Sequence, residues 1–325
     1  MKNSIFNKFF GYLLTLIFII TVNFFIPRLM PGDPFTYLSS DESGMSVNYS
    51  DAEVQKYKEY YGLDKPLRIQ YLGYIRNILK GDLGYSIILN DKVTNIVFTR
   101  ITWTLGIVII SIIISSLFGS LLGSVSAYNR NKLIDKMLYF VFMTISEIPG
   151  FIIGLIFLFF FAAYLNIFPL AGGITPFTDY KSTLELIKDI LYHGILPTLS
   201  LSFINMGGFY LISRNSMINV LEKDYIVTAN AKGLRISSII FNHALRNALL
   251  PIITRMFLSL GKAIGGAVLI ENVFRYPGLG TLMREAVFFR DYPLIQGIFL
   301  IMAVMVLMMN FMADMIYKKL DPRLR

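Results

Sequence analysis

The stretch DYIVTANAKGLRISSIIFNHALRNALLP, residues 224–251, decides the fold because it is a charged segment with a helix–glycine–helix pattern between two apolar runs. It predicts two short helices. Asp224 can cap the first helix, whose body over 225–232 stops at Gly233, because glycine readily adopts the left-handed conformation found at helix C-termini. The second helix runs toward Pro251. Such a segment, held at a membrane surface by an apolar span on each side, predicts a firm protrusion for a soluble partner.

The composition identifies a membrane protein with several spans. The chain has 325 residues, of which 55% are hydrophobic, and its mean hydropathy is +0.59. The net charge of +9 does not indicate a nucleic-acid partner, because much of the excess lies in short loops at span ends, where it sets orientation. The absence of cysteine excludes disulfides, thiolate zinc sites and thiol nucleophiles, and two histidines are too few to indicate a metal centre.

Six apolar runs predict an all-α fold with six transmembrane helices. About 20 residues cross a hydrocarbon core of about 30 Å. The first run follows two lysines but lacks a small-residue cleavage site, so it predicts an uncleaved span. Pro149-Gly150 predicts a bend in the third run. The runs cover residues 9–27, 101–127, 137–165, 195–213, 250–270 and 294–317.

The distribution of basic residues predicts that both termini are cytoplasmic. With that orientation, the inner segments hold 14 Lys and Arg in 59 residues and the outer segments hold 13 in 121. Cytoplasmic loops are enriched in Lys and Arg, although long loops are largely exempt from the rule. The protrusion at 224–251 is then cytoplasmic.

The polar segment after the first span predicts a helical extracytoplasmic insertion. Ser50 and Glu53 form a capping box, and Gly62 follows the last periodic residues of that helix. A second helix can start with Pro66 in its first turn and stop at Gly81. The expected organisation is a first transmembrane helix over 1–30, the insertion over 31–100, and a five-helix core over 101–325 containing the cytoplasmic loop 214–249.

Several motifs, spread nearly end to end in a shared order, resemble permease subunits of ATP-binding-cassette (ABC) importers. The form is that of the dipeptide, oligopeptide and nickel importer family. Any one of these Pro/Gly clusters alone is ordinary turn chemistry. The motifs are TANAKGL (228–234), HALRNALLP (243–251), MPGDP (30–34), YYGLDKP (60–66), GDLGYS (81–86), ENVF (271–274), PGLG (277–280), RDYPLIQG (290–297) and LDPRLR (320–325).

The resemblance implies a type I importer permease fold and a transport role in the cell membrane. The implied partners are a second homologous permease, two ATPase subunits that bind ATP and Mg, an extracytoplasmic substrate-binding protein, and membrane lipid. The chain itself is then expected to bind no cofactor and no metal and to catalyse no reaction. The implied coupling residues, which contact or position the ATPase-binding helix, are Asp224, Tyr225, Thr228, Ala229, Ala231, Lys232, Gly233, Leu234, Arg246 and Pro251.

Two positions depart from the family pattern. Val227-Thr228-Ala229 stands where the broader permease loop has Glu-Ala-Ala, and Thr102 stands where proline is usual before the second span. Small side chains at Ala229 and Ala231 would let the helix enter a partner cleft closely, and Gly233 would permit a tight exit.

Ionisable residues inside spans are candidates for the translocation path because burying a charge in hydrocarbon is costly. Lys262 falls about midway along the fifth span, and Glu147 lies in the third. Either could hold a terminus of a peptide, or they could pair with each other or with a companion subunit. Arg255 and Asp314 lie near the expected cytoplasmic ends.

Missing motifs narrow the function further. No phosphate-binding loop is present, so the chain is not expected to hydrolyse ATP, and no HExxH or GxSxG motif indicates an enzyme. Three alternatives stay open: an importer of nickel or another metal chelate, an ion-coupled secondary transporter, and a membrane enzyme or scaffold.

Overall fold

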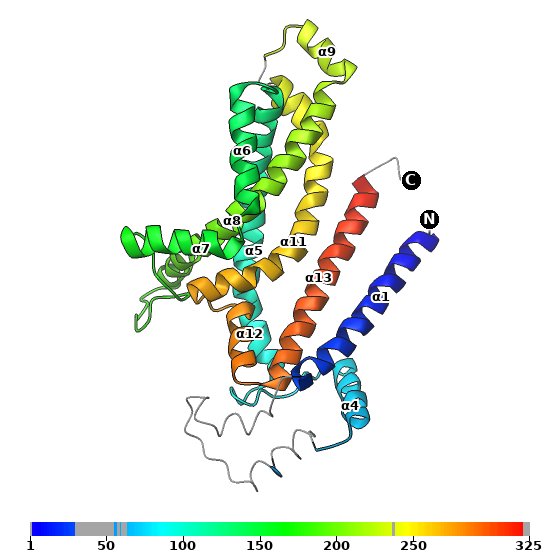
Figure 1. The fold of residues 1–325 in the computed structure, drawn as a ribbon, viewed down its shortest axis with the longest axis vertical. Coiled ribbons are helices and arrows are strands. Elements are labelled where there is room, and N and C mark those ends of the chain that lie inside the picture. Colours follow the sequence, from blue (N-terminus) through cyan, green and yellow to red (C-terminus); the bar gives the residue numbers. More distant parts are fainter. Residues whose placement is uncertain (1, 30–54, 57–58, 60–63, 236–237, 321–325) are drawn as a thin grey trace. The chain divides into compact units, whose positions relative to one another are not determined.

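The computed structural model describes residues 2–29, 55–56, 59, 64–235 and 238–320. Within these ranges every regular element is a helix, apart from one isolated bridge between Tyr85 and Lys92. The helix predicted from Ser50 to Gly62 falls almost wholly outside them. The elements in Figure 1 are α1 (Lys2–Phe25), η1 (Pro27–Leu29), α4 (Leu67–Leu79), α5 (Val93–Tyr128), α6 (Leu133–Glu147), α7 (Gly150–Phe157), η3 (Leu158–Tyr164), α8 (Thr183–Leu221), α9 (Asp224–Ala231), η4 (Ile239–Leu245), α11 (Arg246–Phe274), α12 (Leu279–Phe288) and α13 (Tyr292–Leu320).

Five helices are individually long and apolar enough to cross a membrane, and a sixth span is broken. Helix α6 and the α7–η3 helix together satisfy the same criterion but are bent by 100° at the break between them. The bend predicted at Pro149-Gly150 is therefore confirmed, and it is sharp. The six-span prediction is met when this pair counts as one span; the cytoplasmic placement of both termini stays a prediction.

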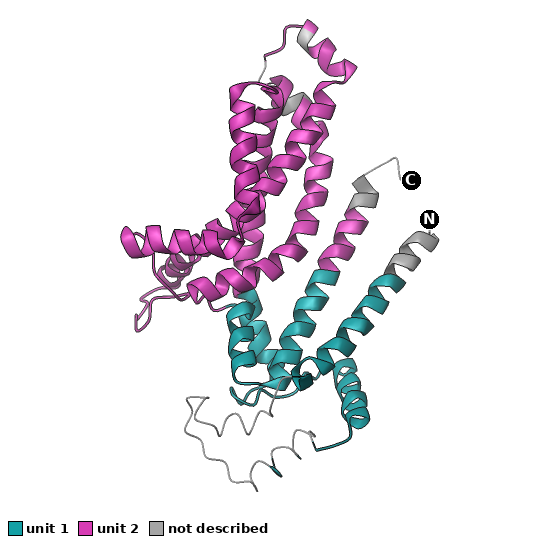
Figure 2. Ribbon diagram, in the orientation of Figure 1, with its two compact units in different colours: residues 1–102, 278–307 teal, residues 103–277, 308–325 magenta. Residues whose placement is uncertain are grey.

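The chain divides into two compact units, coloured in Figure 2. Unit 1 comprises residues 1–102 and 278–307, and unit 2 comprises residues 103–277 and 308–325. Helices α5 and α13 each contribute to both units.

Unit 1 has a core formed by the start of α5, helix α12 and the start of α13. The sequence did not predict α12, which begins after Gly278 and is amphipathic. It buries Leu279, Leu282 and Met283 against apolar side chains of the other two helices. The burial of this face explains why a short segment between two spans is helical.

Asp291 ties two distant motifs together within unit 1. Its Oδ2 accepts hydrogen bonds from Ser86 Oγ (2.5 Å) and from the backbone N–H of Ile88 (3.1 Å). Its Oδ1 accepts from the Leu294 N–H (3.1 Å), so Asp291 also caps α13. The GDLGYS and RDYPLIQG motifs therefore meet at one buried carboxylate.

In unit 2, helices α5 and α8 pack with almost no side chain between them. A Cβ added at Gly119 would lie 2.8 Å from the Met206 carbonyl oxygen, and one at Gly123 would lie 2.5 Å from the Tyr210 carbonyl oxygen. Ser213 Oγ donates across the seam to the Ser120 carbonyl (2.8 Å). Small residues thus bring the two backbones into direct contact, as is typical of membrane helices.

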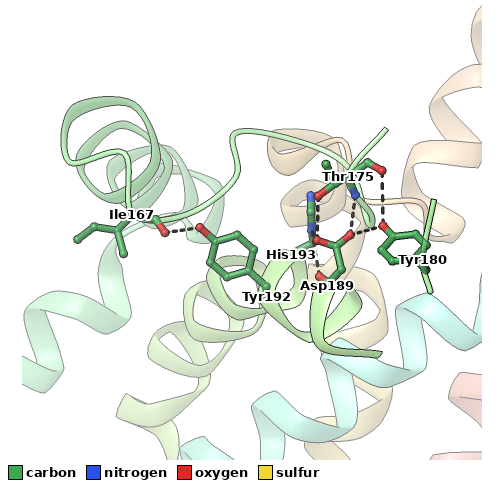
Figure 3. Close-up of polar contacts among 6 residues, drawn as sticks. All are labelled: Ile167, Thr175, Tyr180, Asp189, Tyr192 and His193. Atoms are coloured by element: carbon green, nitrogen blue, oxygen red, sulfur yellow. Dashed lines mark hydrogen bonds and ion pairs between the residues drawn. The ribbon is translucent and has the colours of Figure 1, made fainter. Parts of the chain in front are cut away.

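The loop between η3 and α8 is pinned to α8 by Asp189, as Figure 3 shows. The Asp189 carboxylate accepts hydrogen bonds from the Thr175 N–H (2.6 Å), Thr175 Oγ1 (2.8 Å) and the Tyr180 hydroxyl (2.6 Å). His193 Nδ1 lies 3.4 Å from the same carboxylate, one turn along α8. Tyr192 donates to the Ile167 carbonyl (2.5 Å), which fixes the start of the loop.

Candidate functional site

The segment 224–251 forms a short helix followed by one long helix. Helix α9 ends at Ala231, and Gly233 has φ of +71°, which confirms the predicted left-handed stop. Asp224 is the first helical residue and not the cap, because the Lys223 carbonyl accepts from the Ile226 N–H (2.9 Å). The negative charge of Asp224 still interacts favourably with the positive, N-terminal end of the helix dipole.

The second helix is much longer than the short helix that the sequence predicts. The π-helix η4 continues directly into α11, and Pro251 lies inside that helix. Proline removes one backbone hydrogen bond, while the apolar residues on both sides keep the helix packed, so a single continuous element leads from the protrusion into the fifth span. Figure 1 shows α9 beyond the end of the bundle at which α8 ends and α11 begins.

One face of α9 is buried against its own chain. Ile226 and Ala229 belong to a cluster with apolar residues from the ends of α5 and α8, from η4 and from the start of α11. The other buried members are Ala127, Met217, Ile239, Ile240, Ala244 and Ala248. The expectation that Ala229 enters a partner cleft is therefore wrong, because its side chain is only 6% exposed and packs inward.

The opposite face of α9 and the turn after it are exposed. The exposed side chains include apolar groups, notably Val227, which is 61% exposed. Contact with a partner would remove this apolar surface from water. The backbone of Arg246 lies at the start of α11, but its side chain is outside the described part. We call the following exposed residues the outer face of α9: Tyr225, Val227, Thr228, Ala231, Lys232 and Leu234.

A buried ion pair supports the base of this protrusion. Arg214 near the end of α8 donates from Nε and Nη2 to the two carboxylate oxygens of Asp135 in the first turn of α6, at 2.8 and 2.9 Å. Ser126 Oγ (2.5 Å) and the Asn131 N–H (3.0 Å) complete the acceptor sites of Asp135. Ser126 also contacts the Tyr210 hydroxyl at 2.7 Å. Helices α5, α6 and α8 are thereby locked together where α9 begins.

Sequence reasoning missed this network. In the sequence, Asp135 and Arg214 are only two opposite charges at the ends of two apolar runs. Two separate, solvated side chains would give the same pattern. The pairing needs the fold, because Asp135 and Arg214 are 79 residues apart.

The two candidates for the translocation path lie on separate helices of unit 2. Lys262 is exposed on α11, on a strip with Leu258, Gly265, Gly266 and Leu269, and a Cβ at either glycine would meet nothing within 4 Å. Glu147 is exposed at the end of α6, at the 100° break. Among the described residues no ion pair joins Lys262 to Glu147.

Arg255 shares the face of Lys262, two turns away along α11. A Cβ at Gly208 of α8 would lie 2.7 Å from its Nη2, so the guanidinium lies against the backbone there. Its buried Nε has no hydrogen-bond partner within the part of the chain that the structure describes. This face of α11 therefore carries two cations, Lys262, which is exposed, and Arg255, which is half-buried against α8.

Comparison with known proteins agrees with this architecture. The family model described as "Binding-protein-dependent transport system inner membrane component" matches residues 119–325. The chain is 36% identical over 304 residues to the oligopeptide transport system permease protein AppB of Bacillus subtilis, covering 93% of each chain. It is 32% identical over 325 residues to the glutathione transport system permease protein GsiC of Pectobacterium atrosepticum, covering 100% of this chain and 99% of that one.

The fold also resembles that of a solved transporter. A chain of the inward-facing MetNI methionine ABC transporter matches with a TM-score of 0.56 at 13% sequence identity, covering 70% of this chain and 97% of that one. The matches in sequence and the long apolar helices place the protein in the cell membrane as a multi-pass protein. The chain belongs to the family of binding-protein-dependent transport-system inner membrane components, the permease subunits of ABC importers.

Proposed function

We propose that this chain is one of two permease subunits of an importer that carries peptides, including di- and oligopeptides, across the cell membrane. Two ATPase subunits binding ATP and Mg would drive it, and a substrate-binding protein would deliver the peptide. Two relatives described above, an oligopeptide permease and a glutathione permease, support a peptide substrate. Import of a nickel chelate remains the alternative within the same architecture.

The observation that carries the proposal is the packing of α9. Its inward face is fixed in a cluster with the end of α8 and the η4–α11 helix, and its outer face is exposed. A partner that grips the outer face and moves must therefore move α8 and α11 as well. Since α11 carries the cationic strip, motion of the ATPase would change access to Lys262. Differential affinity of the two states for ATP and for loaded binding protein would supply the driving force.

The strip on α11 gives the proposed path its chemistry. Arg255 and Lys262 lie seven residues apart, about 10 Å along the helix. Both are cations with no carboxylate partner among the described residues, and they would attract the C-terminal carboxylate of a peptide. Glu147 could hold the amino terminus. The two glycines beside Lys262 leave room for a substrate backbone.

The test is association with the ATPase and uptake in reconstituted vesicles. Val227→Glu places a charge on the outer face of α9 without touching the buried cluster, so it should abolish co-purification of the ATPase and ATP-dependent peptide uptake. Leu170→Glu, at an exposed apolar residue in the loop before α8, is the matched control and should leave both intact. Uptake by the wild-type chain without any ATPase would favour an ion-coupled transporter and overturn the proposal.

A further inference from the structure

Unit 1 contains a cavity of about 590 Å³ that the transport role leaves unexplained. It lies among η1, Lys65 and helix α4, residues 83–85 and the start of α13. Its walls include two cations and several neutral hydrogen-bonding groups, and none of the described residues that line it is an acid. The polar lining residues are Arg28, Lys65, Gln70, Tyr74, Asn77, Tyr85 and Gln296.

The Arg28 guanidinium is held in place by three of its N–H groups, and its other N–H groups can bind a ligand. Nη1 donates to the Phe24 carbonyl (2.8 Å), and Nε (3.0 Å) and Nη2 (2.8 Å) donate to Gln70 Oε1. The group also lies over the Phe24 ring, 3.7 Å from its centroid. Arginine has five N–H donors, so two remain. In the part of the chain that the structure describes, neither Arg28 nor Lys65 has a carboxylate partner, and both therefore favour an anion.

The cavity has a polar end and an apolar end. The hydrogen bond from Asn23 Nδ2 to the Gln296 carbonyl (2.8 Å) sets the register of α1 against α13, which run in opposite directions. Arg28 lies five residues beyond Asn23 in one direction, and Leu300 lies four residues beyond Gln296 in the other. At 1.5 Å per residue, Arg28 and Leu300 are separated by about 13 Å along the helices. An occupant that satisfies both ends is amphiphilic.

The elements around the cavity suit a membrane boundary. Helix α4 exposes Leu72 and Leu79 beside Arg68 and Arg76, a pattern found in helices that lie in the headgroup region. Arg28 lies in the last turn of the first span, so the polar end is at headgroup level and Leu300 is at acyl-chain depth. This geometry favours a lipid over a soluble anion.

We propose that this cavity binds one anionic phospholipid, with its phosphodiester at Arg28 and Lys65 and an acyl chain directed toward Leu300. A glycerol headgroup would find hydrogen-bonding partners in Asn77 and Tyr85. A choline or ethanolamine headgroup would bring a third cation into a cavity whose described lining offers no acid to pair with it, so zwitterionic lipids should bind more weakly. The site is independent of the peptide substrate.

The experiment uses the full chain purified in mild detergent, with native mass spectrometry to count bound lipid and melting temperature to follow stabilisation. Phosphatidylglycerol should bind at one molecule per chain and raise the melting temperature, whereas phosphatidylcholine and soluble glycerol phosphate should not. Arg28→Gln should weaken phosphatidylglycerol binding about tenfold or more, as expected for loss of a charged hydrogen-bonding group. Arg76→Gln removes the same charge from the exposed face of α4 and should leave binding unchanged.

A second variant separates lipid binding from folding. A Cβ at Gly73 meets nothing within 4 Å, so Gly73→Leu projects into the cavity without a clash and also favours the helix. It should preserve the melting temperature without lipid and abolish the stabilisation by phosphatidylglycerol. Equal binding of both phospholipids, full binding by Gly73→Leu, or an Arg28→Gln defect that is the same with and without lipid would each overturn the proposal. Binding of glycerol phosphate as tight as that of the lipid would overturn it as well.

Discussion

Replacement of Asp135 by alanine should destabilise the protein more than replacement of any exposed acid at the same end of the bundle. The carboxylate accepts two hydrogen bonds from Arg214, one from Ser126 and one from the Asn131 N–H, and the residue is only 3% exposed. Its loss would leave the mostly buried Arg214 guanidinium without a counter-charge. Breaking a buried pair in this way costs about 3–5 kcal/mol.

The exposed pair between Arg130 and Glu222 is the internal control. Its Nη1 and Oε1 atoms are 2.9 Å apart, but the side chains are 52% and 65% exposed. Such surface pairs contribute about 0.2–1 kcal/mol. Glu222→Ala should therefore cost less than about 1 kcal/mol, although the two ion pairs have similar lengths.

The measurement is the free energy of unfolding of the purified chain in mixed micelles, titrated with a denaturing detergent. A double-mutant cycle adds Arg214→Ala, which removes the uncompensated cation and should recover part of the loss caused by Asp135→Ala. Co-purification of the ATPase should fall with Asp135→Ala, because the ion pair locks the base of α9. A cost below about 1 kcal/mol, equal to that of Glu222→Ala, would refute the reasoning that burial makes this pair structural.

Three further predictions follow from the site and from unit 1. Gly233→Pro should abolish uptake without preventing membrane insertion, because proline cannot adopt φ of +71°, whereas Gly233→Asn should retain uptake; both are checked by transport and membrane fractionation. Lys262→Met should reduce peptide uptake, measured as KM and rate, without reducing co-purification of the ATPase, and equal uptake would remove Lys262 from the proposed path. Burial raises the pKa of the Asp291 carboxyl, so the folded state binds this proton more tightly than the unfolded chain does. The stability that this protonation contributes is therefore complete below about pH 4 and is lost as pH rises through the folded-state pKa. Because asparagine cannot titrate, the melting temperature of Asp291→Asn relative to wild type should increase from pH 4 to pH 7.

The spans could be predicted because their signal is local. Apolar runs of about 20 residues and a Pro-Gly pair are visible in any window of the sequence, and the structure places helices and the break where they indicate. The angle of 100° at the break was not predictable, since it depends on what α6 and α7 pack against. The predicted run began at residue 101, whereas α5 begins at Val93. The extra turns contain polar residues, and they are helical because their apolar face is buried in the core of unit 1.

The candidate site was only half predictable for the same reason. The left-handed stop at Gly233 is a property of one residue, and it is present. Which face of α9 turns inward is set by residues of α8 and η4, so Ala229 was assigned to a partner when it belongs to the interior. The meeting of Ser86 with Asp291, 205 residues apart, likewise leaves no local trace.

The glycine and serine seam between α5 and α8 has a consequence for how the protein tolerates change. Where backbones touch, even a single added methyl group has nowhere to go, and the Cβ positions at Gly119 and Gly123 fall on main-chain atoms that cannot rotate away. Gly106, on the same helix, opens onto free space. A saturation library of α5 would therefore sort its glycines into forbidden and permissive ones, with intolerance recurring once per helical turn along a single edge.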